Sequence, residues 1–254
     1  MQVIVRQQGP VRLLVLSRPE VRNALDTALI GELLEAVGSA VVDPGTRALV
    51  ISGAAGHFSA GADLKEALDQ DAAVRRIELL CDVYEAIGTS PKPTVAAISG
   101  ACVGGGAELA AACDIRVSDR SARFRFPGAA LGFPVGAAKL IGLVGLGAAK
   151  DLVLTARAFD AAEALRLGFV QALVDDPLAA ALERAEAIAA NDADAVAWLK
   201  RQLAIFAGLG DRIAAENDAL RSHARAGGDY RALTMEDPKK VGGWAGGGWL
   251  PRSG

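Results

Sequence analysis

The sequence predicts an α/β fold followed by a helical region, and three observations lead to this prediction. Apolar strand patterns alternate with amphipathic helical patterns through most of the chain, which is the element order of an α/β core. Three Ala-rich helical patterns without an intervening strand follow at 177–190, 194–207 and 211–226. A glycine triplet, Gly104–Gly106, stands between a buried strand and a helix. The other expected strands are 2–6, 12–16, 46–52, 94–98, 115–118 and 169–174, and the other expected helices are 27–41, 72–88, 107–113, 136–145, 147–156 and 160–167.

Turn and capping residues justify the ends of several elements. Gly9 and Pro10 separate the first two strands and predict a hairpin. Asp26 precedes the first helix, where its short carboxylate is an expected N-cap. Gly168 follows the helix at 160–167 and is an expected C-cap, because glycine accepts the left-handed conformation there without strain.

The overall composition is that of a globular enzyme. Of the 254 residues, 52% are hydrophobic and 22% are charged, which is too apolar for a disordered chain. The formal net charge of -3 gives no basis for nucleic-acid binding, so we expect no nucleic-acid partner. His57 and His223 are the two histidines, and no Cys/His pattern accompanies them, so no metal site is expected.

The cysteines, Cys81, Cys102 and Cys113, predict buried free thiols in a reducing cytoplasm. Their number is odd and they form no Cys-x-x-Cys pattern. The N-terminus shows no charged and then apolar leader, and no apolar run reaches about 18 residues. We therefore expect neither secretion nor insertion into a membrane.

The glycine triplet starts a helix whose first turn carries a carboxylate. The first amides of a helix have no intrahelical acceptor and lie at the positive end of its dipole, so they stabilise negative charge. Glu108 follows Gly105 by three residues and shares its face of the helix, and its neighbours are apolar. An amide donor and a carboxylate directed at one point predict chemistry through an oxyanion.

A second source of amides is the small-residue loop 53–63, which follows the strand at 46–52. Small residues let a ligand or another backbone approach the amides closely. Two such loops, each after a core strand, could together hold one carbonyl oxygen. A dinucleotide site is not favoured, because the triplet lacks the Gly-x-Gly-x-x-Gly spacing.

An ordered set of motifs extends from about residue 10 to 175. The motifs are Arg18-Pro19, Asn23–Leu25, Phe58–Lys65, Gly100, Gly104–Leu109, Cys113–Ile115, Leu131–Pro134, Leu154-Thr155, Phe159-Asp160 and Glu163–Val170. In this order they resemble the crotonase family, the enoyl-CoA hydratases and isomerases.

The resemblance implies a crotonase-like spiral of repeated ββα units with a C-terminal helical region. The implied organisation is a spiral core with the CoA site at 1–175, a helical trimerisation or lid region at 176–237 and a Gly- and Trp-rich tail at 238–254. It also implies a homotrimer or homohexamer. No cofactor is implied, because coenzyme A is part of the acyl-CoA substrate.

The resemblance further implies the residues of the site. The amides of Ala60 and Gly105 would form the oxyanion hole for the thioester carbonyl. Glu108 matches the first of the two carboxylates that hydratases use on water and on the α-carbon. The implied CoA-binding residues are Ala60, Gly61, Ala62, Asp63 and Gly105.

The chain departs from the family at the second carboxylate, whose position is occupied by Gly128. Glu66, Asp69 and Asp119 are acidic residues that could replace it. Adding water across a double bond needs a base for the water and an acid for the α-carbon. A single carboxylate can do both in a concerted step, or can move one proton in an isomerisation.

The expected activity is therefore hydration or isomerisation of an enoyl-CoA, with Glu108 as the acid/base. Decarboxylation or hydrolysis of a CoA thioester would use the same oxyanion hole without a second acid. The alternative to an enzyme is a non-catalytic protein that binds acyl-CoA. Gly128 supports this alternative, because it stands where the family has its second carboxylate.

Overall fold

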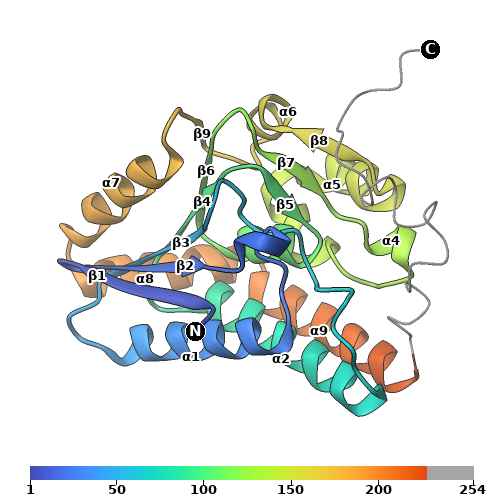
Figure 1. Cartoon of the computed structure of the whole chain (residues 1–254). Coiled ribbons are helices and arrows are strands. Elements are labelled where there is room, and N and C mark those ends of the chain that lie inside the picture. Colours follow the sequence, from blue (N-terminus) through green and yellow to red (C-terminus); the bar gives the residue numbers. More distant parts are fainter. Residues whose placement is uncertain (228–254) are drawn as a thin grey trace.

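A six-stranded sheet lies at the centre of the fold (Figure 1). The computed structural model describes residues 1–227, and in it the strand order is β1-β2-β3-β4-β6-β9. The strands are β1 (Val3–Gln8), β2 (Val11–Leu16), β3 (Ala48–Gly53), β4 (Thr94–Ile98), β6 (Ile115–Ser118) and β9 (Ala172–Leu173). β1 and β2 form the predicted antiparallel hairpin, and the other neighbours pair in parallel. The predicted α/β class is confirmed.

A second, three-stranded sheet begins where the chain leaves β4. It contains β5 (Ala101–Val103), β7 (Arg123–Arg125) and β8 (Ala158–Asp160). Gly100 makes the turn between β4 and β5 with a φ of +54°. A β-carbon at Gly100 would lie 2.3 Å from the Gly56 carbonyl oxygen and 2.4 Å from Nδ1 of His57. Glycine is therefore required there, and its turn brings the loop after β3 against β5.

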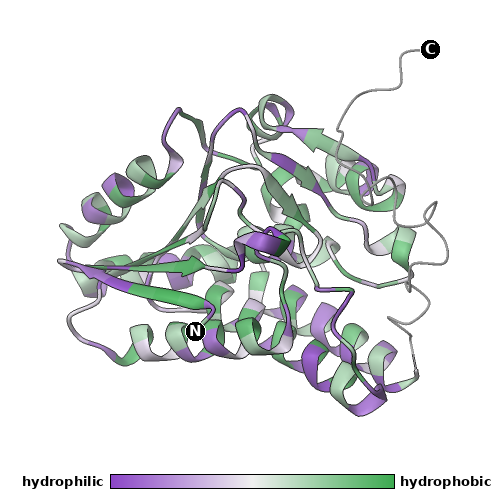
Figure 2. Ribbon diagram, in the orientation of Figure 1, coloured by the Kyte–Doolittle hydropathy of each residue, from purple (hydrophilic) through white to green (hydrophobic). Residues whose placement is uncertain are grey.

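Helices cover both faces of the large sheet. The helical elements are η1 (Pro19–Val21), α1 (Thr27–Val42), α2 (Gln70–Gly88), α3 (Gly105–Ala112), α4 (Gly128–Leu131), α5 (Ala137–Thr155), α6 (Ala161–Arg166), α7 (Pro177–Ala189), α8 (Ala193–Phe206) and α9 (Leu209–Arg225). α1, α2 and α3 share the main hydrophobic core. α7 packs Ala181 and Ala185 onto Val50 and Val95 of the opposite face. Figure 2 shows the apolar strands between these helices.

Most predicted helix ends agree with the structure. Oδ1 of Asp26 accepts a hydrogen bond from the Leu29 amide at 2.8 Å, which confirms the predicted N-cap. Gly168 has a φ of +81°, as expected of a C-cap position. α5 contains the two helices expected at 136–145 and 147–156, which meet at a kink where Gly145 has non-helical dihedral angles. α4, β5 and β8 were not predicted, since elements of three or four residues carry no periodicity.

The three C-terminal helices differ in how they pack. α9 lies beside α2 (Figure 1) and also packs on α5. By contrast, α8 has no buried residue and exposes several large apolar side chains. The expected tail at 238–254 lies outside the described residues. All three cysteines are buried and free, as predicted. Within residues 1–227, no helix combines the length and the apolarity that a membrane span needs.

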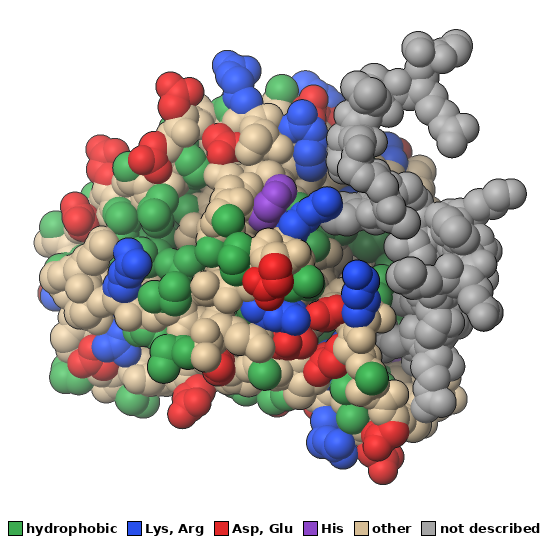
Figure 3. All heavy atoms as spheres, in the orientation of Figure 1, with side chains coloured by type: hydrophobic (Ala, Val, Ile, Leu, Met, Phe, Trp, Pro, Cys, Tyr) green, Lys and Arg blue, Asp and Glu red, His purple; other side chains and the backbone are tan. Residues whose placement is uncertain are grey.

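The face drawn in Figure 3 carries acidic and basic side chains side by side over its described part. Neither sign of charge gathers into one patch there. This distribution agrees with the small net charge of -3.

Candidate active site

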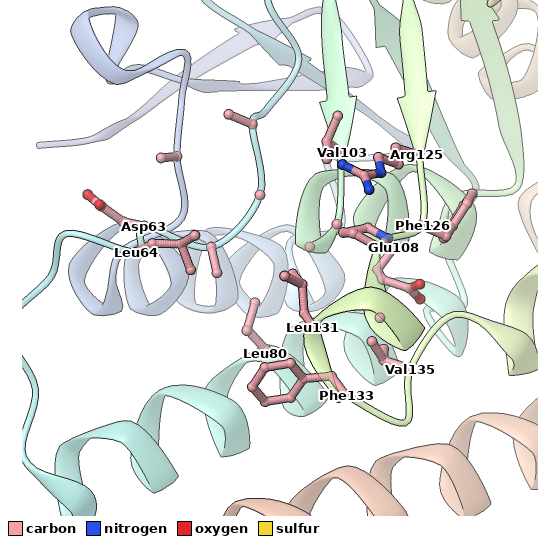
Figure 4. A pocket seen from close by; sticks show the side chains of 18 of the residues that line it. Asp63, Leu64, Leu80, Val103, Glu108, Arg125, Phe126, Leu131, Phe133 and Val135 are labelled. Atoms are coloured by element: carbon pink, nitrogen blue, oxygen red, sulfur yellow. The ribbon is translucent and has the colours of Figure 1, made fainter. Parts of the chain in front are cut away.

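A cavity of about 380 Å³ lies between the loop after β3, the start of α3 and the segment from β7 to α5 (Figure 4). Its inner wall is mostly apolar, which suits an acyl chain. The apolar lining includes Leu80, Val103, Phe126, Leu131, Phe133, Val135 and Leu220. Its charged lining residues are Glu20, Arg22, Asp63, Lys65, Glu108 and Arg125.

β5 holds the two amide-bearing loops against each other. The Ser59 amide donates to the Ala101 carbonyl at 2.8 Å, and the Val103 amide donates to the Ser59 carbonyl at 3.0 Å. A β-carbon on Gly106 would lie 2.6 Å from the Ser59 carbonyl oxygen. The glycine triplet therefore permits the close approach of loop and helix that the sequence predicted.

Gly105 begins α3, and its amide is one available donor. Gly104 is the N-cap residue, and it has no side chain to satisfy the first amides of the helix. Among the described residues, the Gly105 amide has no hydrogen-bond acceptor. This amide lies at the positive end of the helix dipole, so it can donate to an anionic oxygen in the cavity.

The amide of Ala60 is not available as the second donor. It donates to the Arg22 carbonyl at 2.9 Å, so its hydrogen is used within the fold. The prediction that Ala60 supplies the oxyanion hole is wrong for this reason. The signal for that contact is not local, because α1 and β3 separate Arg22 from the loop.

Ala62 offers the amide that Ala60 does not. The Leu25 amide donates to the Gly61 carbonyl, and the Asp63 amide donates to the Leu25 carbonyl. In this parallel bridge, the backbone amide and carbonyl of Ala62 therefore face away from Leu25. Its amide has no acceptor among the described residues. A β-carbon built on Gly105 would lie 3.7 Å from the Ala62 nitrogen. The free amides of Ala62 and Gly105 are therefore neighbours.

Gly61 shapes the loop that presents this amide. Its φ is +89°, a conformation that glycine adopts without strain. A β-carbon there would lie 2.6 Å from the Val103 carbonyl oxygen and 3.3 Å from the Gly105 nitrogen. Any larger residue would push the loop away from α3.

Glu108 is buried at the cavity wall, with 2% of its surface exposed. In Figure 4 its side chain lies among Phe126, Leu131 and Val135. Burial is the largest effect on its carboxyl group and raises its pKa to about 7. The nearby ammonium of Lys139 opposes this rise, and the carboxylate of Glu216 adds to it. A carboxyl group with a pKa near neutrality can both accept and return a proton.

Lys139 and Glu216 form a buried ion-pair chain with Glu108. Nζ of Lys139 lies 3.0 Å from Oε2 of Glu108 and 2.6 Å from Oε1 of Glu216. Although burial alone would lower the pKa of Lys139, the two carboxylates raise it above its ordinary value. Sequence reasoning missed Glu216, because it stands on α9 among exposed polar residues. Only the packing of α9 on α5 brings it here.

Comparison with known proteins identifies the family. The family model described as enoyl-CoA hydratase/isomerase matches residues 6–219. This chain belongs to the enoyl-CoA hydratase/isomerase family. The predicted resemblance to the crotonase family is thereby confirmed.

Individual members of the family are similar over most of their length. A 2,3-dehydroadipyl-CoA hydratase of Escherichia coli is 37% identical over 66% of this chain and 68% of its own. The structure of an enoyl-CoA hydratase from Bacillus anthracis has a TM-score of 0.78 and 29% identity, and covers 88% of this chain and 90% of that one. The structure of a monofunctional enoyl CoA isomerase from M. smegmatis has a TM-score of 0.71 and 32% identity, and the match covers 82% of this chain and 93% of that one.

In this member of the hydratase/isomerase family, Gly128 leaves no space for a side chain. A β-carbon there would lie 2.8 Å from the carbonyl oxygens of both Phe133 and Val135. The backbone after α4 therefore occupies the volume that a carboxylate at this position would need. The chain has neither an acid at position 128 nor room for one.

The acidic residues considered as replacements are engaged elsewhere. Glu66 accepts from the Thr27 amide and pairs with Arg76. Asp69 caps α2. Asp119 binds Ser99 and Ser121. None of these three acids lines the cavity, so none of them is placed to replace the missing acid.

Asp63 stands at the cavity rim and has a structural task. Its Oδ2 accepts from Arg18 at 2.9 Å, and its Oδ1 accepts from the Lys65 amide at 3.0 Å. Ala60, Gly61 and Ala62 line the cavity with it. The stretch predicted to contact CoA thus borders the cavity along its whole length.

Proposed function

We propose that this chain hydrates a 2-enoyl-CoA thioester, with Glu108 as the single acid/base. The observation that carries this proposal is the position of Glu108, whose near-neutral carboxyl shares one cavity with the free amides of Ala62 and Gly105. Relatives named as enoyl-CoA hydratases support hydration as the reaction.

The thioester oxygen would accept hydrogen bonds from the amides of Ala62 and Gly105. The Glu108 carboxylate removes a proton from water while the water oxygen bonds to the β-carbon. The electron pair of the double bond moves to the thioester oxygen, where the two amides stabilise the enolate. The Glu108 carboxylic acid then returns the proton to the α-carbon. One water is added, and Glu108 ends as a carboxylate.

Isomerisation of a 3-enoyl-CoA is the second candidate, and Gly128 favours it. Here Glu108 removes a proton from the α-carbon and returns it to the γ-carbon, so the double bond moves into conjugation with the carbonyl. No water takes part, so no second carboxylate is needed. The isomerase from M. smegmatis is a structural relative that is named for such an activity.

Two ultraviolet assays on the purified protein separate the candidates. Hydration of crotonyl-CoA removes the absorbance of the conjugated thioester, whereas isomerisation of 3-hexenoyl-CoA creates it. Loss of absorbance in the first assay, abolished by Glu108→Gln, is the expected result. Binding of both thioesters without a change in absorbance would contradict both candidates and favour an acyl-CoA-binding protein, and activity in the second assay alone would identify an isomerase.

We also propose how the CoA portion is held. The segment from Ala60 to Asp63 would contact it, and Arg22, Lys65 and Arg125 line the same cavity with positive charge that suits its phosphates. Coenzyme A is part of the substrate in this proposal, and no cofactor is required.

An assembly of three copies, or of six, is proposed from the surface of α8. Its exposed apolar side chains are Trp198, Leu199, Leu203, Ile205 and Phe206. A helix with such a face needs a partner surface. Light scattering of the wild type should give a trimer or hexamer, and a monomer would contradict this. The buried free thiols fit a reducing compartment, and we propose the cytoplasm.

A further inference from the structure

Three charged side chains form a buried chain that runs from the cavity to α9. Glu108 belongs to α3, Lys139 to α5 and Glu216 to α9. Their side chains are 3%, 1% and 7% exposed. Burying a charge is unfavourable unless it is paired, and apolar residues often fill such a space at least as well. The cluster therefore calls for an explanation beyond packing.

Glu216 is the fixed end of this chain. Its Oε2 accepts hydrogen bonds from the amides of Gly136, Ala137 and Ala138, at 2.9, 2.8 and 3.0 Å. These are the first amides of α5, so the carboxylate also lies at the positive end of the helix dipole. Its Oε1 accepts from Nζ of Lys139. One carboxylate thus fixes both the start of α5 and the side chain of Lys139.

The ammonium of Lys139 contacts the carboxylates of Glu216 and Glu108 in different ways. Its aligned hydrogen bond goes to Glu216, while its contact with Oε2 of Glu108 is an ion pair without hydrogen-bond alignment. The other oxygen, Oε1, lies beside Gly136, where a β-carbon would come within 3.1 Å of it. The two oxygens of Glu108 are therefore distinguished by their surroundings.

We propose that Lys139 and Glu216 are positioning residues, which together turn Oε2 of Glu108 toward the ammonium and leave Oε1 for the substrate. The last described helix is then part of the active site. This inference rests on the proposed function, in which Glu108 moves the proton. Lys139 and Glu216 act through Glu108 and do not line the cavity.

The two residues have opposite electrostatic effects on Glu108. The Lys139 ammonium favours the carboxylate, whereas the Glu216 carboxylate favours the neutral acid. The other titratable groups facing Lys139 come from α2. They are Tyr84, whose ring centroid lies 5.0 Å from Nζ, and the Cys81 thiol, whose pKa burial raises to about 11. The Cys81 thiol is therefore neutral near pH 7, and opposite shifts in two variants can be assigned to the charged pair.

The test compares Lys139→Met and Glu216→Gln by the pH dependence of kcat/KM with crotonyl-CoA or, if only isomerisation is found, 3-hexenoyl-CoA. The acid limb of this pH profile is the range in which kcat/KM falls as Glu108 becomes protonated. We expect Lys139→Met to move this limb to higher pH by about one unit or more, and Glu216→Gln to move it to lower pH. In Lys139→Met, kcat should fall about tenfold or more while KM stays close to the wild-type value, since positioning acts on proton transfer. A merely structural role predicts no opposite shifts.

Infrared titration of the Glu108 carboxyl in the free protein, assigned with Glu108→Gln, gives a readout without turnover. The same opposite shifts are expected there. If the wild type turns over no enoyl-CoA, the proposed function fails, while this titration still tests the positioning role. Coincident titrations in wild type and both variants would overturn it, and so would shifts in the same direction.

The matched control is Asp82→Asn, which removes the ion pair between Arg221 of α9 and Asp82 of α2. It weakens the attachment of α9 without touching the buried chain, so its acid limb should coincide with that of the wild type. An equal shift in this control would assign the effect to loosening of α9 and overturn the proposal. If Lys139→Met fails to fold, Glu216→Gln and this control decide the matter by themselves.

Discussion

The two sides of the cavity are built in different ways. On one side, backbone amides of Ala62 and Gly105 face the cavity from two loops that glycines hold close together. On the other side, Glu108 pairs with Lys139 of α5, which in turn pairs with Glu216 of α9. The amide side depends on local backbone geometry, whereas the carboxylate side depends on the packing of distant elements.

This difference determines how each side responds to change. A backbone amide cannot be removed by an ordinary substitution, but its loop can be displaced by a single β-carbon, as at Gly61. The carboxylate side is sensitive to every charge nearby, because little water screens a buried pair. The following predictions test each side in turn.

The largest effect is expected for Glu108→Gln, which removes the proton-transferring group and keeps the shape of the side chain. We expect kcat to fall by about 10²- to 10⁴-fold, as is usual for loss of a general acid/base. Lys139 keeps its partner Glu216 at 2.6 Å, so the fold should persist. Steady-state kinetics with circular dichroism check both points. Glu183→Gln on the surface of α7 is the matched control and should be fully active.

The next effect concerns the amide side. Replacing the peptide bond before residue 62 by an ester removes the Ala62 N–H and keeps its methyl group. We expect kcat to fall by about 10²- to 10³-fold, the cost of one oxyanion-hole donor. The same ester at Ala60 removes only the bond to Arg22, so it should lower stability by about 1 kcal/mol and leave kcat nearly unchanged. If the ester at residue 60 lowered kcat more than the ester at residue 62, the amide of Ala60 would be the oxyanion-hole donor instead.

A smaller effect is expected from pH. Because burial raises the pKa of Glu108 to about 7, its base form is lost below that pH. We expect kcat/KM to fall about tenfold per pH unit on the acid side of pH 7. An acid limb below pH 5 would show that burial does not govern this carboxyl group.

The same group affects stability. Its folded pKa of about 7 lies above the ordinary 4.5, so between these values the folded state holds a proton that the unfolded state has released. The free energy of unfolding should therefore decrease as pH rises through this window. Glu108→Gln should lack that decrease, which urea titrations at several pH values can measure.

The smallest effect is expected for Gly128→Ala, which tests whether the second carboxylate could return. Its β-carbon would meet two carbonyl oxygens at 2.8 Å, so we expect a loss of about 1 to 3 kcal/mol in the free energy of unfolding. Gly31→Ala in α1 meets no atom within 4 Å and should instead stabilise the protein by about 0.5 to 1 kcal/mol. Equal stability of the two variants would show that space at residue 128 is not limiting.

Local patterns predicted part of each side of the cavity. The glycine triplet, the strand before it and the apolar neighbours of Glu108 all act within a few residues, so the start of α3 and the burial of Glu108 could be predicted. Ala60 was assigned in place of Ala62 because the sequence does not show how Gly61, with a φ of +89°, breaks the regular alternation of amides between these two residues. That choice depends on Leu25, which pairs with the loop only in the folded chain.

The helical block was harder to interpret. Its Ala-rich pattern predicted three helices, and α7, α8 and α9 confirm them. Nothing in their periodicity shows that Glu216 turns inward to the first turn of α5. A carboxylate on a polar helix resembles a surface residue until the helix that it caps is known.

The capping of α5 by Glu216 has a consequence for the order of folding. The loops that present the Ala62 and Gly105 amides can form from residues up to the end of β7, but the start of α5 receives its anion only when the last described helix docks. Without α9, Lys139 would lose one of its two counterions, and the cavity would lose Leu220 from its lining. The amide side should therefore be complete at an earlier stage of folding than the carboxylate side.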